Sequence, residues 1–141
     1  MRRENLRAIQ PKSFKPRTTD SEHGLPVCAS LLQDGANAPT ENGEVLVGDI
    51  TYLRLRGGKF CYLACLQDKF TRRIVGWKVS ERMTAQLVID VFNQARRRGL
   101  IKKGAIIHSD QGSQYAAVEY RRLLYIGGFR QSMWRKGKGS R

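Results

Sequence analysis

Two aspartates stand where carboxylates could do chemistry. Asp49 lies inside the run GDITY at 48–52, among apolar neighbours, and Asp110 directly follows a short apolar run at 105–108. A carboxylate inside a strand is costly unless it is paired or binds a metal ion. Two carboxylates that lie close together repel each other, and a divalent cation such as Mg²⁺ relieves that repulsion. If the fold brings the two together, the bound cation could activate a nucleophile at a phosphodiester.

Each aspartate also has an ordinary structural interpretation. Asp49 can face solvent on the polar side of a strand. Asp110 can be a turn or N-cap residue before a helix that begins at Ser113. The spacing of the two residues does not decide between these interpretations and a metal site, so both stay open.

The residues around the aspartates predict the elements that must carry them. β-branched and aromatic runs predict strands, the segment RGGK at 56–59 predicts a hairpin, and helical spacing of apolar residues predicts two helices, the first with Thr84 at its N-cap. The predicted order is three strands, a helix, a strand, a helix and a strand, over residues 45–55, 60–67, 73–80, 83–98, 105–108, 113–126 and 129–133.

This order predicts which strands are neighbours. Three strands joined by tight turns form an antiparallel meander, and strands reached through helices can lie parallel to the first. The first and fourth strands can then lie side by side, which puts Asp49 next to Asp110. The predicted fold is α/β, a ribonuclease-H-like mixed five-stranded sheet with flanking helices. We expect it to lack the final helix of that fold, which would follow the fifth strand.

The charge distribution predicts a polyanionic partner. The chain has 141 residues and a net charge of +14, and the excess lies in three blocks, at 1–20, 96–103 and 121–141. Lys and Arg gain by displacing counterions from phosphates, so we favour nucleic-acid binding over a solvated basic face. The candidates for phosphate contacts are Arg96, Arg97, Arg98, Arg130, Arg135, Lys136 and Lys138.

Four sequence blocks carry a resemblance to a known family. They are VGDITY at 47–52, TRRIVGW at 71–77, HSDQGSQY at 108–115 and QSMWRKG at 131–137. In order and spacing they resemble the catalytic core of DDE insertion-sequence transposases of the orfB type and of retroviral-type integrases, over about residues 44–137. The resemblance implies a triad of two Asp and one Glu that binds Mg²⁺ or Mn²⁺. Asp49 matches the first acid and Asp110 the second, as catalytic and metal-binding residues.

The same resemblance implies DNA nicking and strand transfer, with insertion-sequence ends and target DNA as partners. Full-length transposase and further copies of this chain are candidate protein partners. A membrane is not expected, since no apolar run could cross one and no apolar stretch follows the N-terminus. We therefore expect the chain in the bacterial cytosol or nucleoid, with its three cysteines reduced.

The third acid has no counterpart in the sequence. The family places a Glu on the helix after the fifth strand, beyond Arg141, and Glu119 on the preceding helix is not expected to replace it. Residues 1–43 hold all four prolines and predict a basic arm or linker, and 44–141 predict an incomplete catalytic core. We expect a transposase fragment cut at both ends, inactive alone and binding its ion weakly. The alternative is a non-enzymatic nucleic-acid-binding remnant.

Three aromatic residues and a histidine complete the candidates. His108 closes a predicted strand, and a structural role is favoured over that of a general base. Trp77 and Tyr62 are predicted to lie in the core. Trp134 lies among basic residues, and it either stacks on a nucleobase or packs on the body of the domain.

Overall fold

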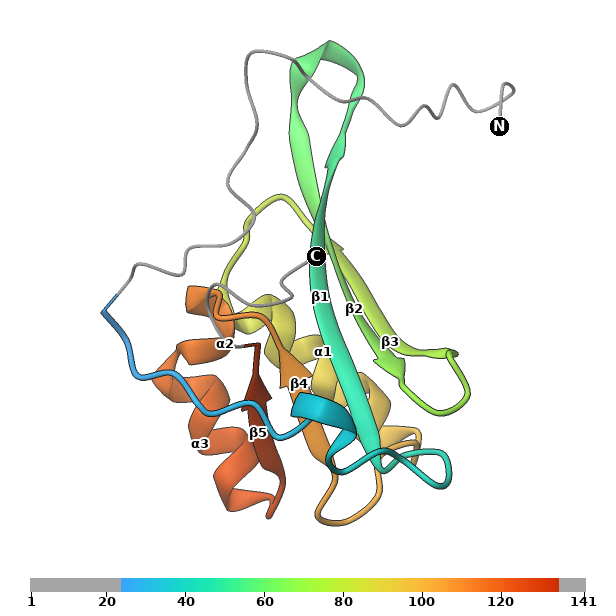
Figure 1. Ribbon diagram of the computed structural model, residues 1–141. Coiled ribbons are helices and arrows are strands. Elements are labelled where there is room, and N and C mark those ends of the chain that lie inside the picture. The colour runs from blue at the N-terminus through green and yellow to red at the C-terminus, as the bar shows by residue number, and fades with distance from the viewer. Residues whose placement is uncertain (1–23, 135–141) are drawn as a thin grey trace.

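The computed structural model describes residues 24–134, which form one sheet with three helices (Figure 1). Short 3₁₀ turns at Gln33–Gly35 and Arg56–Gly58 complete the regular structure of this part of the chain. The elements in order are β1 (Val45–Arg54), β2 (Phe60–Asp68), β3 (Ile74–Ser80), α1 (Ala85–Arg97), β4 (Ile106–Ser109), α2 (Ser113–Ala116), α3 (Val118–Ile126) and β5 (Arg130–Met133).

The sheet is mixed, as the sequence predicts. Its strand order is β3-β2-β1-β4-β5. β1, β2 and β3 form an antiparallel meander, whereas β4 runs parallel to β1 and β5 runs parallel to β4. Parallel neighbours need a crossover connection, and the helices between β3, β4 and β5 supply it. Among residues 24–134 no helix follows β5.

The helices cover one face of the sheet. α1 packs against β2 and β3, and α3 packs against β5. α1 begins after Thr84, which occupies the predicted N-cap position but makes no side-chain capping bond. The helix approaches the sheet closely at Gly76, where an added Cβ would lie 2.6 Å from the carbonyl oxygen of Val91. Glycine at this position therefore sets the distance between helix and sheet.

The predicted helix over 113–126 is interrupted. Ala117 has extended backbone angles (φ −61°, ψ 143°), so the segment forms two helices, α2 and α3. Residues five apart on one straight helix would point about 140° apart around its axis. The break instead brings the rings of Tyr115 and Tyr120 together, 5.6 Å between centroids, in the core. The prediction of one continuous helix was wrong because periodicity does not report such a break.

The second face of the sheet carries no α-helix in the part of the chain that the structure describes. Trp77 lies on it and is 54% exposed, so its predicted place in the core was wrong. The residue faces away from α1 because side chains alternate along β3 and its neighbour Gly76 meets α1; Val75, two residues before Trp77, is the extra residue of a bulge in the pairing with β2. Tyr62, on the helix-covered face, packs against the core as predicted.

The segment before β1 runs along the free edge of β5. The Leu31 N–H donates to Ser132 Oγ (2.8 Å), and the Met133 N–H donates to the Ala29 carbonyl (3.4 Å). This pairing covers an edge strand that would otherwise expose its backbone groups. Residues 1–23 lie outside the described residues, and the division into an arm at 1–43 and a core at 44–141 stays a prediction.

Candidate active site

The register of β1 and β4 brings Asp49 and Asp110 together. The last pair of that parallel ladder is Val47 with His108, and each aspartate comes two residues later, Asp49 within β1 and Asp110 just after β4. Because side chains alternate along a strand, Asp49 shares the face of Val47, which is the face opposite α1. Both aspartates line one pocket, and each lies within electrostatic range of the other. The predicted juxtaposition is therefore present.

A tight turn after β4 positions Asp110. The backbone N–H of Gly112 donates to Asp110 Oδ1 over 2.8 Å. A Cβ at Gly112 would lie 2.9 Å from that same oxygen, so a side chain there would displace the carboxylate. The Gly112 carbonyl also accepts from the N–H groups of Tyr115 and Ala116, which starts α2. The sequence QGS at 111–113 thus fixes the carboxylate against the helix start.

A tyrosine packs against β1 at Gly48, the residue before Asp49, from the opposite face of the sheet. A Cβ at Gly48 would lie 3.1 Å from Tyr115 Oη and 3.2 Å from its Cε1. The Tyr115 ring is buried, and burial followed by the charges of nearby acids raises its pKa well above the ordinary range. The hydroxyl therefore stays protonated. The pairing of Gly48 with Tyr115 was not predicted from the sequence, although both residues lie in the motif blocks around the aspartates.

The electrostatics of the pocket favour a cation. Burial by the pocket walls and, second, the negative charge of Asp110 raise the pKa of Asp49, and a hydrogen bond from the Ile50 backbone opposes the rise. Burial and then the charge of Asp49 also raise the pKa of the neighbouring Cys65 thiol. A divalent cation bound between the two carboxylates would relieve the unfavourable effect of the Asp110 charge on ionised Asp49.

The pocket combines these carboxylates with apolar walls. Its volume is about 340 Å³, and its lining includes Val47, Ile74 and Trp134 besides the two aspartates. The carboxylates fit the oxygen ligands that Mg²⁺ prefers. Within residues 24–134, however, no group of three or more His, Cys, Asp or Glu side chains is placed to hold a metal ion. Glu119 is exposed on α3 and belongs to no such group.

The surroundings of His108 indicate a structural role. Its side chain is fully buried, and Nδ1 lies 2.7 Å from Ser132 Oγ. Burial, and second the positive charge of Lys69, lowers its pKa to about 4. The imidazole is therefore neutral at physiological pH. These contacts agree with the predicted structural role.

The four predicted phosphate contacts within residues 24–134 lie away from the pocket lined by Asp49 and Asp110, here called the acid pocket. Arg96 and Arg97 are in the last turn of α1, and Arg98 is its C-cap. The Arg96 guanidinium lies 5.7 Å from the centroid of the Phe129 ring, and Arg130 donates from Nε to the Gly104 carbonyl.

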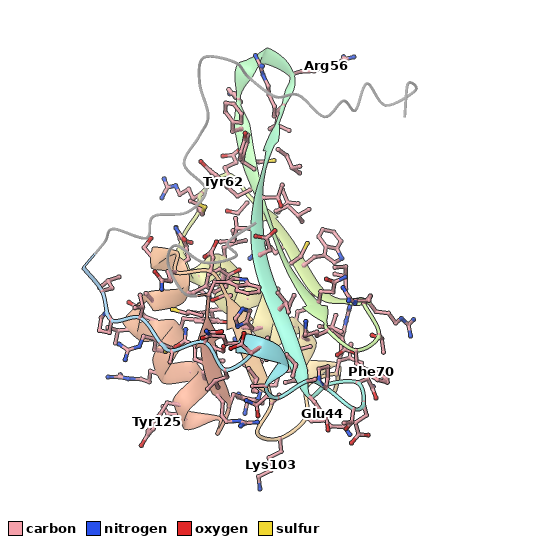
Figure 2. All side chains as sticks on the ribbon, viewed as in Figure 1. Glu44, Arg56, Tyr62, Phe70, Lys103 and Tyr125 are labelled. Carbon is pink, nitrogen blue, oxygen red and sulfur yellow. The ribbon has the colours of Figure 1, made fainter. Side chains whose placement is uncertain are left out.

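This cluster lies where β4 and β5 begin, whereas Asp110 follows the end of β4. Figure 2 shows Lys103 at the same end of the molecule and Arg56 at the tip of the β1–β2 hairpin. Arg135, Lys136 and Lys138 lie outside the described residues, and all the predicted phosphate contacts stay predictions.

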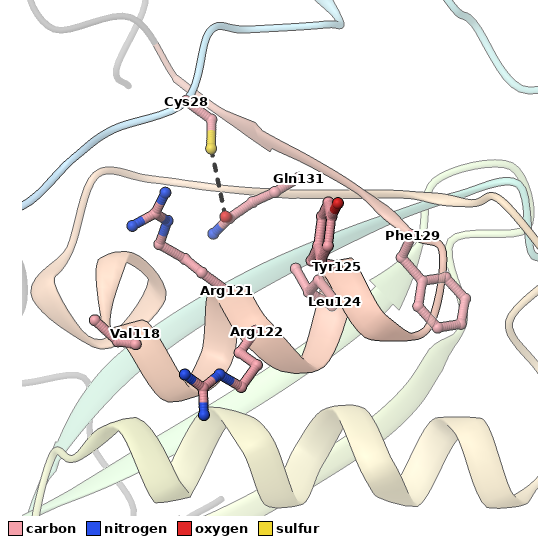
Figure 3. A pocket seen from close by; sticks show the side chains of 8 residues that line it. All are labelled: Cys28, Val118, Arg121, Arg122, Leu124, Tyr125, Phe129 and Gln131. Atoms are coloured by element: carbon pink, nitrogen blue, oxygen red, sulfur yellow. Dashed lines mark hydrogen bonds between the residues drawn. The ribbon is translucent and has the colours of Figure 1, made fainter.

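A larger hollow of about 430 Å³ lies between α3 and the segment that precedes β1 (Figure 3). The Cys28 thiol donates to Gln131 Oε1 across it, and Arg121 and Tyr125 line its walls. Among residues 24–134, no carboxylate lines this hollow. It therefore lacks the metal-binding chemistry of the smaller pocket.

Comparison with known proteins agrees with this geometry. Residues 39–139 match the family model of the integrase core domain. The chain belongs to this family. The integrase core includes both aspartates and the β-strands that bring them together, so the resemblance seen in the sequence is confirmed.

Curated relatives place this integrase core among bacterial insertion-sequence proteins. The chain is 39% identical over 137 residues to the transposase InsF for insertion sequence IS3A of Escherichia coli K12, a match that covers 97% of this chain and 46% of that protein. It is 41% identical over 132 residues to an uncharacterized 31 kDa protein of insertion element IS600 from Shigella sonnei, covering 94% and 47%. The chain thus spans about half the length of these relatives.

Solved structures confirm the predicted ribonuclease-H-like fold. The catalytic core domain of the HTLV-2 integrase, solved in complex with magnesium, matches with a TM-score of 0.60 at 17% identity, covering 67% of this chain and 62% of that chain. A simian T-cell lymphotropic virus intasome matches with a TM-score of 0.60 at 19% identity, covering 85% and 40%. Across residues 24–134, no helix has the length and apolar character needed to cross a membrane.

Proposed function

We propose that this chain carries part of the catalytic core of a DNA transposase, with Asp49 and Asp110 as two of its metal-binding acids. The observation that carries the proposal is their meeting in one pocket at the end of the β1–β4 ladder. The raised pKa of Asp49, caused by burial and by Asp110, supports a site that favours a cation. The similarity to the transposase of an insertion sequence supports DNA as the substrate.

In this proposal the side chains have separate tasks. Asp49 and Asp110 would hold Mg²⁺ or Mn²⁺, and such an ion would supply the chemistry that activates a nucleophile and stabilises the leaving oxygen of a phosphodiester. The Gly112 N–H orients Asp110, and Tyr115 supports β1 behind Asp49. The charge of +14 draws insertion-sequence ends and target DNA to the surface.

The isolated chain is proposed to bind its ion weakly and to lack nicking activity. Within residues 24–134 no third acid joins the pair, and two carboxylates alone leave most ligand positions to water. Further copies of the chain or full-length transposase are the proposed protein partners. DNA binding in the bacterial cytosol or nucleoid then remains the property that the isolated chain retains.

Metal-stimulated DNA binding tests the proposal. The binding of a labelled insertion-sequence end is measured by fluorescence anisotropy with and without Mg²⁺, for wild type, Asp49→Asn and the surface control Glu119→Gln. Wild type and Glu119→Gln are expected to bind more tightly with Mg²⁺, because the ion screens the carboxylates from phosphate. Asp49→Asn is expected to bind without this stimulation. An equal response of all three proteins to Mg²⁺ would refute the proposed metal site.

A nicking assay separates the two candidate functions. We expect no cleavage of the labelled end by the isolated chain with Mg²⁺ or Mn²⁺. Robust cleavage that is lost in Asp49→Ala would show that the isolated chain suffices for catalysis. DNA binding that depends on salt but not on Mg²⁺ or Asp49 would instead favour the non-enzymatic remnant.

A further inference from the structure

The acid pocket has an aromatic wall that metal binding does not explain. Trp134 follows β5 directly, lines the pocket together with Asp49 and Asp110, and remains 41% exposed. Large aromatic side chains usually bury most of their surface, so a half-open indole beside two carboxylates requires an explanation. The contacts of Trp134 with β4 hold its indole in the pocket wall.

Backbone pairing and a ring contact fix Trp134 in position. Its N–H donates to the Ser109 carbonyl over 2.9 Å, which continues the pairing of β5 with β4. Its ring meets the ring of His108 edge to face, with centroids 4.6 Å apart and an interplanar angle of 81°. His108 is itself buried and bonded to Ser132. The indole is therefore supported on one side while part of its surface stays open.

The composition of the pocket fits a nucleotide of a DNA strand. The phosphate of the nucleotide would lie next to the two carboxylates, and a cation would join them to the phosphodiester. Val47, Ile74 and Trp134 supply apolar and aromatic surface beside them. The volume of about 340 Å³ is within the range of small-ligand sites. Every nucleobase has a π-face that can stack on an indole, whatever the sequence.

We propose that Trp134 is the stacking platform for the nucleobase next to the phosphate held at Asp49 and Asp110, and thereby a positioning residue for the DNA strand. This inference rests on the proposed function. The net charge of +14 favours DNA over a peptide as the occupant. Stacking tolerates any base, so the platform positions the strand without reading its sequence.

The chain contains a matched control for this test. Trp77 lies on the same face of the sheet, in one cross-strand row with Cys65 and Asp49, and is 54% exposed. It does not line the pocket. Because these are the two tryptophans of the chain, Trp77→Phe reports Trp134 fluorescence alone, and Trp134→Phe reports Trp77 alone.

The experiment titrates both single-tryptophan proteins with an oligothymidylate of eight nucleotides in Mg²⁺, and with an abasic strand of equal length. We expect quenching of Trp134 by the base-bearing strand only, and no quenching of Trp77. Trp134→Ala is expected to weaken binding of oligothymidylate about 5- to 100-fold. Trp77→Ala is expected to leave binding unchanged, and Trp134→Tyr is expected to restore most of it because the ring is kept.

The outcomes separate this inference from the proposed function. Equal quenching by both strands, or unchanged affinity in Trp134→Ala, would overturn the stacking role. If the stacking role fails but Asp49→Asn still abolishes the Mg²⁺ response, the proposed function remains supported without the stacking role. A wild-type chain that binds neither strand at low salt would overturn both.

Discussion

Lowering the pH is expected to destabilise this fold through one buried imidazole. His108 is fully buried beside Ser132, and burial together with the charge of Lys69 lowers its pKa from 6.5 to about 4. As the pH falls below 6.5, His108 becomes protonated in the unfolded chain, whereas in the folded chain it stays neutral down to about pH 4. The unfolded state binds more protons throughout this window and is therefore favoured.

The expected size follows from the two pKa values. The full pKa shift of His108 corresponds to about 3 kcal/mol in the free energy of unfolding. Of this, about 2 kcal/mol is lost between about pH 7 and pH 5. The assay is urea denaturation of wild type and His108→Gln across this range. The raised pKa of Asp49 acts with the opposite sign, since its folded form holds a proton to higher pH.

That contribution, and any from His23, cancels in the comparison because both proteins keep these residues. We expect the stability of wild type to fall relative to that of His108→Gln by about 2 kcal/mol from pH 7 to pH 5. Parallel pH profiles for the two proteins would refute the buried, neutral state of His108.

Three substitutions test the helix–sheet contact, the position of Asp110 and the charge repulsion in the acid pocket. Gly76→Ala is expected to cost about 1–3 kcal/mol in urea denaturation, because the new methyl would lie 2.6 Å from a fixed carbonyl oxygen of α1; a neutral effect would contradict the close approach of β3 and α1. Gly112→Ala is expected to weaken Mn²⁺ binding about 10-fold while the fold persists, because its Cβ would lie 2.9 Å from Asp110 Oδ1; unchanged Mn²⁺ affinity would show that Gly112 does not position that carboxylate. Asp49→Asn is expected to raise the melting temperature by a few degrees at neutral pH without divalent cations, because it removes one of two repelling charges; a lower melting temperature in scanning calorimetry would argue against repulsion in the pocket.

The sheet and the pairing of the aspartates could be predicted from the sequence because both follow from local patterns. Alternating and β-branched residues mark the strands, and the order of elements constrains which strands are neighbours. The strand that carries Asp49 could therefore be placed beside the strand before Asp110. Whether the two carboxylates share one pocket depends on register, which the structure supplies through the pair Val47 and His108.

Other features depend on tertiary packing that periodicity does not report. The break at Ala117 exists because Tyr115 and Tyr120 both pack in the core. The exposure of Trp77 depends on which face of β3 meets α1, and the strand's residues 74–80 contain apolar side chains on both faces. The close approach of Tyr115 to Gly48 joins residues that are far apart in the sequence. These contacts become visible only when the chain is folded.

Divalent-metal binding tests the central claim most directly. Mn²⁺ titration followed by electron paramagnetic resonance is predicted to detect one weak site per chain, lost in both Asp49→Asn and Asp110→Asn and retained in Glu119→Gln. Glu119 is the matched control because it is an exposed acid on α3 that belongs to no group of metal-binding side chains within residues 24–134. Mn²⁺ binding that survives both aspartate substitutions, or no binding by the wild-type chain, would contradict the account.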